Sequence, residues 1–186
     1  EKVFGAPKLV KASAGYYDGR ADHWKQKKAM GGGAMYDMGV YTLQAARYCT
    51  GEEPIAVTAR HSTTRPDIYT EVDETTHFEL EFPSGARAEC ATSFGQSMNS
   101  LHVTYENGWV QLQPFQAYNG IRGEASDGRR FDARIPNQQA KQMDDDALAI
   151  LEGRPMLAPG EEGLRDIRVI EAVYEAAAKG ERVVLD

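Results

Sequence analysis

The chain has 186 residues, the length of a single domain, and its hydrophobic (41%) and charged (26%) fractions are those of an ordinary globular protein. A formal net charge of −7 argues against a nucleic-acid partner, because phosphate binding needs clustered lysine and arginine. No apolar run in the sequence approaches the roughly 18 residues that span a bilayer, so we expect no membrane partner.

The cysteine content bears on the cellular compartment. Cys49 and Cys90 are too few for a disulfide framework, and we expect both to be buried thiols in a reducing environment. The expected location is therefore the cytoplasm. The chain starts at Glu1 without a methionine, so an export signal removed upstream is also compatible with this sequence.

The first third of the chain predicts one strand and one helix. Residues 7–17 are rich in β-suited side chains and few breakers, which indicates a strand. A polar connection follows at 18–28, where Trp24 either lines a pocket rim or covers the core. Three glycines then open a helix expected at 34–49, and Gly51 and Pro54 supply its end.

The middle of the chain alternates apolar and polar residues with period two, which is typical of strands. Short turn signals at residues 83–85, 107–108 and 127–128 separate these runs. Seven or eight strands joined in this way indicate a large, mostly antiparallel sheet. The expected segments are residues 55–61, 72–82, 86–94, 101–105 and 109–112, with a further hairpin within 118–135.

The last third predicts helices at 137–153 and 164–177, the second stopped at Gly180, and a final edge strand at 183–185. The order of elements indicates an α+β fold, a large open sheet with helices packed on one face. The other face must be solvated or pair with another copy, and the sequence permits both.

One side of the helix expected at 34–49 carries four polar residues. Spacings of four, three and four place Asp37, Tyr41, Gln44 and Tyr48 on the same face. A carboxylate one turn before a phenol can hold a substrate hydroxyl while the phenol moves a proton, provided that a neighbour lowers the phenol pKa. A tyrosine that faces the core, after an aspartate favoured by the helix dipole, explains the same spacing.

Other chemistries find little support in the residues. The four histidines are dispersed and there is no Cys-x-x-Cys, so we expect no metal site. Residues 144–146 are consecutive aspartates in a helical pattern, typical of a solvated face. There is no Gly-x-Ser-x-Gly elbow and no Gly-x-Gly-x-x-Gly dinucleotide fingerprint. The residues alone therefore indicate a sugar-sized pocket with an acid–base pair and no evident source of redox or hydrolytic power.

A set of motifs runs along nearly the whole chain. The motifs are Trp24-Lys25, Gly31-Gly32-Gly33, Asp37-x-Gly39-x-Tyr41, Ala46-Arg47-Tyr48-x-x-Gly51-Glu52-Glu53-Pro54, Glu71-Val72-Asp73-Glu74, Phe82-Pro83-Ser84-Gly85, Glu152-Gly153-Arg154-Pro155, Pro159-Gly160-Glu161-Glu162-Gly163-Leu164-Arg165-Asp166-Ile167-Arg168 and Ile170-Glu171-Ala172-Val173-Tyr174-Glu175-Ala176. Together they resemble the second domain of the glucose–fructose oxidoreductase/inositol dehydrogenase/MocA family. Tyr41 stands where many relatives carry histidine, which is similar to the glucose–fructose oxidoreductase branch.

The resemblance implies a two-domain enzyme that moves hydride between a sugar or polyol and NAD or NADP. It implies that Asp37 orients the substrate hydroxyls and that Tyr41 is the acid–base group, with Trp24, Lys28 and Tyr118 as weaker candidates for the pocket wall. A Rossmann domain would bind the cofactor and supply the lysine of a Glu-Lys-Pro motif, which depresses the Tyr41 pKa. The open sheet face would build a homo-oligomer.

The chain departs from the family in lacking the cofactor domain. Glu1-Lys2 matches the start of Glu-Lys-Pro, but Val3 replaces the proline, and we interpret the match as coincidence. We therefore expect residues 1–186 to form one domain that is inactive alone and binds no cofactor by itself. Two other functions remain open, a non-catalytic sugar-binding or dimerisation module and a dihydrodiol dehydrogenase-like activity.

Overall fold

The structure, a computed structural model, describes residues 3–185, and the Glu1-Lys2 pair lies outside the described residues. This part of the chain forms one nine-stranded sheet in the order β8-β7-β6-β5-β1-β4-β3-β2-β9. β1 runs parallel to β4, and every other neighbouring pair is antiparallel. The strands are β1 (Pro7–Gly15), β2 (Ala56–Ser62), β3 (Thr75–Glu81), β4 (Arg87–Ser93), β5 (Met98–Tyr105), β6 (Gly108–Leu112), β7 (Ile121–Ala125), β8 (Arg130–Ala133) and β9 (Val183–Val184).

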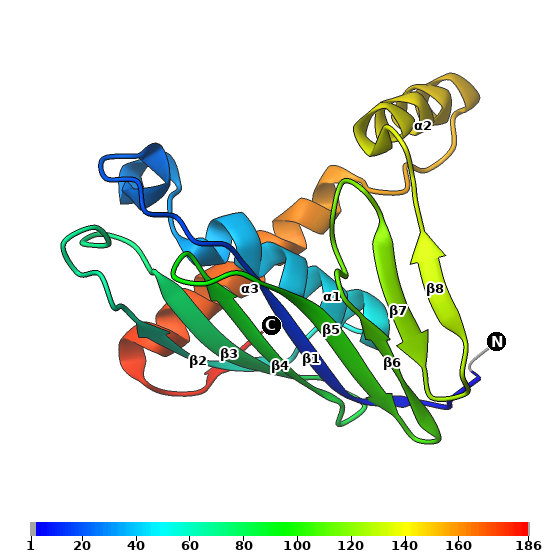
Figure 1. Cartoon of the computed structure of the whole chain (residues 1–186), viewed down its shortest axis with the longest axis horizontal. Coiled ribbons are helices and arrows are strands. Elements are labelled where there is room, and N and C mark those ends of the chain that lie inside the picture. The colour runs from blue at the N-terminus through cyan, green and yellow to red at the C-terminus, as the bar shows by residue number, and fades with distance from the viewer. Residues whose placement is uncertain (1–2, 186) are drawn as a thin grey trace.

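Two helices, α1 (Val40–Thr50) and α3 (Gly160–Lys179), cover one face of the sheet, as Figure 1 shows. The α+β class and the mostly antiparallel sheet are confirmed. The sheet has one strand more than the upper expected number, because β9 pairs with β2 at the edge.

The third helix, α2 (Gln138–Glu152), stands beyond the end of β8 and away from the sheet (Figure 1). Ala149 is its one buried residue within the described chain, while Met143, Ile150 and Leu151 are exposed. The bounds of α2 agree with those expected from the sequence. Its position differs from the expected packing on the sheet, because its apolar side chains point away from this domain.

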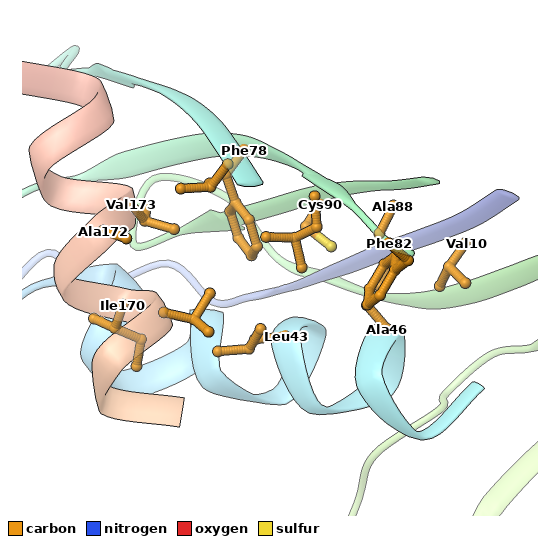
Figure 2. Packing of buried hydrophobic residues seen from close by; sticks show 14 of the residues in the cluster. Val10, Leu43, Ala46, Phe78, Phe82, Ala88, Cys90, Ile170, Ala172 and Val173 are labelled. Atoms are coloured by element: carbon orange, nitrogen blue, oxygen red, sulfur yellow. The ribbon is translucent and has the colours of Figure 1, made fainter. Parts of the chain in front are cut away.

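The core lies between the sheet and the helices α1 and α3. Leu43 from α1 and Val173 from α3 meet Phe78 and Phe82, which come from and just after β3 (Figure 2). Each of these four side chains is at most 2% exposed, so each contributes about 1.5–3 kcal/mol of burial free energy. Cys90 packs in the same cluster, and burial raises the pKa of its thiol to about 12.

An ion cluster joins α1 to α3 at one end of this core. Arg47 donates to Asp166, Glu162 and Glu53, at 2.7, 3.0 and 2.7 Å. Gln44 also donates to Asp166, at 2.7 Å. The arginine and aspartate of the family motifs thus fix the angle between the two helices, and Gln44 belongs to this contact.

The helix expected at 34–49 is confirmed over residues 34–50, but its first part is a π-helical turn, η3 (Met35–Gly39), which leads directly into α1. Two 3₁₀ turns, η1 (Trp24–Gln26) and η2 (Lys28–Met30), lie upstream of it. Gly33 precedes the turn with φ of +117°, and a Cβ there would lie 2.4 Å from an oxygen of Asp73. A glycine is therefore required where the chain turns into the helix.

Candidate active site

A cavity of about 1080 Å³ lies where the end of β1, the turn η3 and the start of α1 face the helix α2. Asp37 and Tyr41, the two residues singled out by their spacing, both line it. Phe115 to Tyr118 form a second wall, and polar residues of α2 form a third. The α2 residues are Gln138, Lys141, Gln142, Asp145 and Asp146.

Three elements hold the Asp37 carboxylate. Lys25 of η1 donates from Nζ to both Asp37 oxygens at 2.7 Å. Tyr16, just after β1, donates its hydroxyl hydrogen to Asp37 Oδ2 at 2.9 Å, and its oxygen accepts from Lys25 Nζ at 2.8 Å. The Lys25 and Asp37 side chains are 19% and 23% exposed, so the ion pair is partly shielded from solvent.

Local structure explains why Lys25 and Tyr16 reach the carboxylate. The His23 ring accepts from Lys25 N–H, and the Gln26 side chain accepts from His23 N–H, which caps the short turn η1. The Tyr16 ring packs edge-on against Phe94 at 5.3 Å between centroids. Both groups are therefore positioned by contacts that do not involve Asp37.

Tyr41 is 39% exposed and lies on the first turn of α1. Burial raises its pKa above the ordinary tyrosine value, and Tyr118 and Asp37 raise it further, whereas Lys25 opposes the rise. The Tyr41 phenol is therefore protonated at neutral pH in this chain. To act as a base it needs another cation nearby.

The weaker candidates fall in different places. Tyr118 lines the cavity with Tyr41 and is 75% exposed. Trp24 lies behind Lys25, with the Lys25 ammonium 5.5 Å from the centre of its ring. Lys28 lies instead at a separate cavity of about 730 Å³, together with Tyr36 and Tyr174. The structure thus brings Tyr118 to the Asp37 cavity and places Lys28 outside it.

Tyr48 and Gln44 share the predicted helix face with Asp37 but not its cavity. Tyr48 is 63% exposed, and Gln44 contacts α3. Gln44 and Tyr48 lie about one and two turns beyond Tyr41 along α1, so they share a helix face with it but lie outside the cavity.

The sequence did not indicate Lys25 and Tyr16 as site residues. Lys25 stood in a motif and in a short basic run, and Tyr16 stood at the end of a predicted strand. They lie 12 and 21 residues before Asp37, so no helical or strand periodicity relates them to it. The one available signal was the lysine next to Trp24 in the family motif.

Two further findings concern the described residues as a whole. Within residues 3–185, no three His, Cys, Asp or Glu side chains are grouped so as to hold a metal ion. In the same part of the chain, no helix is both long enough and apolar enough to cross a bilayer.

Comparison with known proteins identifies the family. Residues 1–111, more than half of the chain, match the family model described as the GFO/IDH/MocA C-terminal domain. The chain belongs to this family. It is 29% identical over 171 residues to a D-xylose 1-dehydrogenase [NADP(+)] of Haloarcula marismortui, covering 89% of this chain and 48% of that protein. It is 25% identical over 179 residues to a D-glucoside 3-dehydrogenase of Escherichia coli, covering 86% and 50%.

Solved structures agree with the fold. An aldose-aldose oxidoreductase from Caulobacter crescentus, complexed with glycerol, superposes with a TM-score of 0.91 at 39% identity, over 98% of this chain and 56% of that one. A levoglucosan dehydrogenase in complex with NADH and levoglucosan superposes with a TM-score of 0.82 at 18% identity, over 98% and 59%, a likeness of fold. The chain spans about half the length of the curated relatives it matches.

Proposed function

We propose that this chain is the substrate-side domain of an NADP- or NAD-dependent oxidoreductase that acts on a sugar or polyol. The observation that carries the proposal is the shared cavity of Asp37 and Tyr41, in a domain of the GFO/IDH/MocA family. Relatives named as sugar dehydrogenases and oxidoreductases support the substrate class. The glycerol bound to the aldose-aldose oxidoreductase is compatible with a polyhydroxylated ligand.

In this proposal Asp37 accepts a hydrogen bond from a substrate hydroxyl and so orients the carbon to be oxidised. Tyr41, in the same cavity, takes the proton of the reacting hydroxyl in the oxidation and returns one in the reduction. The nicotinamide, when bound, accepts the hydride from that carbon. Because the Tyr41 pKa is raised in this chain, the oxidation needs a cation supplied from outside residues 3–185.

The cavity does not have the lining of a phosphate site. Its charges are of both signs, with Lys25 paired to Asp37 and Arg154 paired to Asp145, so they do not form the cationic cradle that a pyrophosphate needs. The sequence also has no glycine fingerprint to cradle phosphates. We therefore assign the dinucleotide mainly to a separate domain, and we expect the 186-residue chain alone to be inactive. Residues 1–186 are then one domain of a two-domain enzyme.

The test is Tyr41→Phe in the complete enzyme, assayed for reduction of NADP⁺ and NAD⁺ with D-xylose, D-glucose, glycerol and a trans-dihydrodiol. We expect turnover with the preferred substrate to fall at least about 100-fold, the size of a lost general acid–base group. Tyr48→Phe, on the same helix but solvent-exposed, is the matched control and should keep full turnover.

Three outcomes would change this proposal: the role of Tyr41, the class of substrate, or the enzymatic activity itself. Equal turnover in Tyr41→Phe and the wild type would remove Tyr41 from the mechanism. A dihydrodiol oxidised in preference to every sugar would select the dihydrodiol dehydrogenase-like alternative. A protein that binds D-xylose but reduces neither cofactor would be the non-catalytic sugar-binding module.

We also propose that the open face of the sheet, opposite α1 and α3, pairs two copies of this chain. This face carries a hollow of about 740 Å³, lined by residues of β1 to β6, among them Lys11, Arg60, His77 and His102. No helix of the described chain covers it (Figure 1). A nine-stranded sheet with one uncovered face offers the area that a stable dimer needs.

A further inference from the structure

Lys25, Tyr16 and Asp37 form a closed set of hydrogen bonds beside Tyr41. The Lys25 ammonium has three hydrogens, and three acceptors lie within 2.8 Å of Nζ, namely both Asp37 oxygens and the Tyr16 oxygen. Tyr16 in turn donates its single hydrogen to Asp37 Oδ2. Every donor of the two side chains is therefore used within the set.

The acceptors of Asp37 are not all used. A carboxylate oxygen has two lone pairs, and those of Oδ2 accept from Lys25 and from Tyr16. Within residues 3–185, Oδ1 accepts from Lys25 alone, which leaves it one lone pair. Of the four acceptor positions on Asp37, this part of the chain leaves one open, and the carboxylate lines the cavity that Tyr41 also lines.

We propose that Lys25 and Tyr16 are positioning residues, which hold the Asp37 carboxylate in one orientation and leave a single acceptor, on Oδ1, for one substrate hydroxyl. This inference rests on the proposed function of Asp37 and Tyr41. Asp37 then orients its substrate through one hydroxyl and does not bridge two neighbouring hydroxyls. Substrate recognition at the remaining hydroxyls falls to other residues of the cavity.

The contact between Lys25 and Asp37 also sets the charge beside Tyr41. Lys25 compensates the negative charge of Asp37, and a charge-assisted pair at 2.7 Å holds both groups in place. Without the ammonium, the unopposed carboxylate would disfavour a phenolate at Tyr41. Lys25 therefore acts on the proton transfer through Asp37, without touching the substrate.

The first test is Lys25→Met in the complete enzyme, with Lys27→Met as the matched control. Lys27 is also on the loop, but it pairs with the exposed Asp22. We expect Lys25→Met to lower kcat/KM for D-xylose at least about 30-fold, mainly through kcat, because orientation and proton transfer are lost together. We expect Lys27→Met to change it less than about twofold.

A second readout is the pH profile of sugar oxidation. The acid limb of kcat/KM should move to higher pH in Lys25→Met, because the pKa of Tyr41 rises when the opposing cation is removed. The other ionisable groups at the cavity are the same in both proteins, so the difference isolates Lys25. These groups are Tyr16, Asp37, Tyr118, Lys141, Asp145 and Asp146.

A third variant removes the Tyr16 hydroxyl, with its two hydrogen bonds, and removes no charge. Tyr16→Phe keeps the ring that packs on Phe94 but neither donates to Asp37 nor accepts from Lys25. We expect kcat/KM to fall at least about 10-fold, because both lost hydrogen bonds are to charged groups. Tyr17→Phe, the next residue and 63% exposed, is its control and should behave as the wild type.

Chemical rescue separates positioning from a structural role. Ethylammonium should restore at least about a tenth of the lost rate to Lys25→Ala, because it can donate the missing hydrogen bonds, while tetramethylammonium at equal concentration should restore none. Wild-type kcat/KM in both Lys25→Met and Tyr16→Phe, with Tyr41→Phe inactive, would overturn this inference and leave the proposed function standing. Full activity of Tyr41→Phe would instead remove the proposed function on which it rests.

Discussion

Glu74 is a buried, strongly anchored carboxylate at the separate cavity that Lys28 lines. Its side chain is 1% exposed and accepts hydrogen bonds from the Thr63 hydroxyl, from Thr64 and from the Arg65 guanidinium. Burial alone would raise its pKa, but these bonds outweigh burial and lower the pKa to about 2. Arg65 in turn donates to the backbone oxygens of Asp18 and Phe94, so the carboxylate anchors the loop before β3 to the end of β1.

This anchor predicts a specific loss of stability in acid. A carboxyl whose pKa falls from 4.5 unfolded to about 2 folded contributes about 3 kcal/mol above pH 4.5, and this contribution is lost as the pH falls toward 2. Urea unfolding of the chain at pH 7, 5, 4 and 3 measures it. The wild type should lose its advantage over Glu74→Gln as the pH falls through this window.

The control is Glu181→Gln, an exposed glutamate after α3 that does not line the open sheet face, and its effect on the free energy of unfolding should be small. A wild-type advantage over Glu74→Gln that is equal at pH 7 and pH 3 would contradict the account of this anchor.

At the scale of single residues, the sequence predicted the part of the site that obeys a local spacing. Asp37 and Tyr41 lie one turn apart, and the structure places both at one cavity. Lys25 and Tyr16 reach Asp37 from a capped 3₁₀ turn and from the end of a strand. Only the folded chain brings such elements together, so periodicity could not identify them.

At the scale of elements, strands such as β1, β3 and β4 were predictable because one face of each is buried, and the turns between strands carry glycine, proline or asparagine. Two features were not predictable from the sequence. The start of β3 lies at Thr75 and not at residue 72, because the backbone oxygen of Asp73 accepts from Ala34 N–H, outside the sheet. The position of α2 was hidden as well, since an apolar stripe shows that a helix face is covered and does not show by what.

The open sheet face carries the prediction that belongs to this scale. Ala91 lies near the middle of that face, on β4 beside the central strand β1, and lines its hollow. Ala91→Glu should place a charge in the interface and convert a dimer of this chain into a monomer, as measured by light scattering after size exclusion. Its free energy of unfolding as a monomer should change little.

Ala178→Glu is the matched control, because Ala178 is exposed on α3 in the opposite layer. It should leave the dimer intact. A wild-type chain that is monomeric at high concentration, or an Ala91→Glu variant that still dimerises, would contradict the assignment of this face.

At the scale of the whole molecule, two sides of the domain have different proposed roles. The uncovered sheet face is assigned to pairing, and the cavity at the ends of β1 and α1 is assigned to the substrate. That cavity holds the Asp37 carboxylate and the Tyr41 phenol, whose pKa is raised above its ordinary value. Under the proposed function, these two groups bind the hydroxyl and move its proton, and the hydride acceptor and the activating cation come from elsewhere.

The most direct measurement of this claim is the rate of NADPH or NADH formation by the native protein purified from its source, compared with the isolated 186-residue chain. The substrates are a panel of aldoses and polyols led by D-xylose and D-glucose. We expect the native protein to reduce one cofactor with at least one sugar and the isolated chain to reduce neither. Failure of the native protein to reduce either cofactor with any member of the panel would contradict the oxidoreductase assignment.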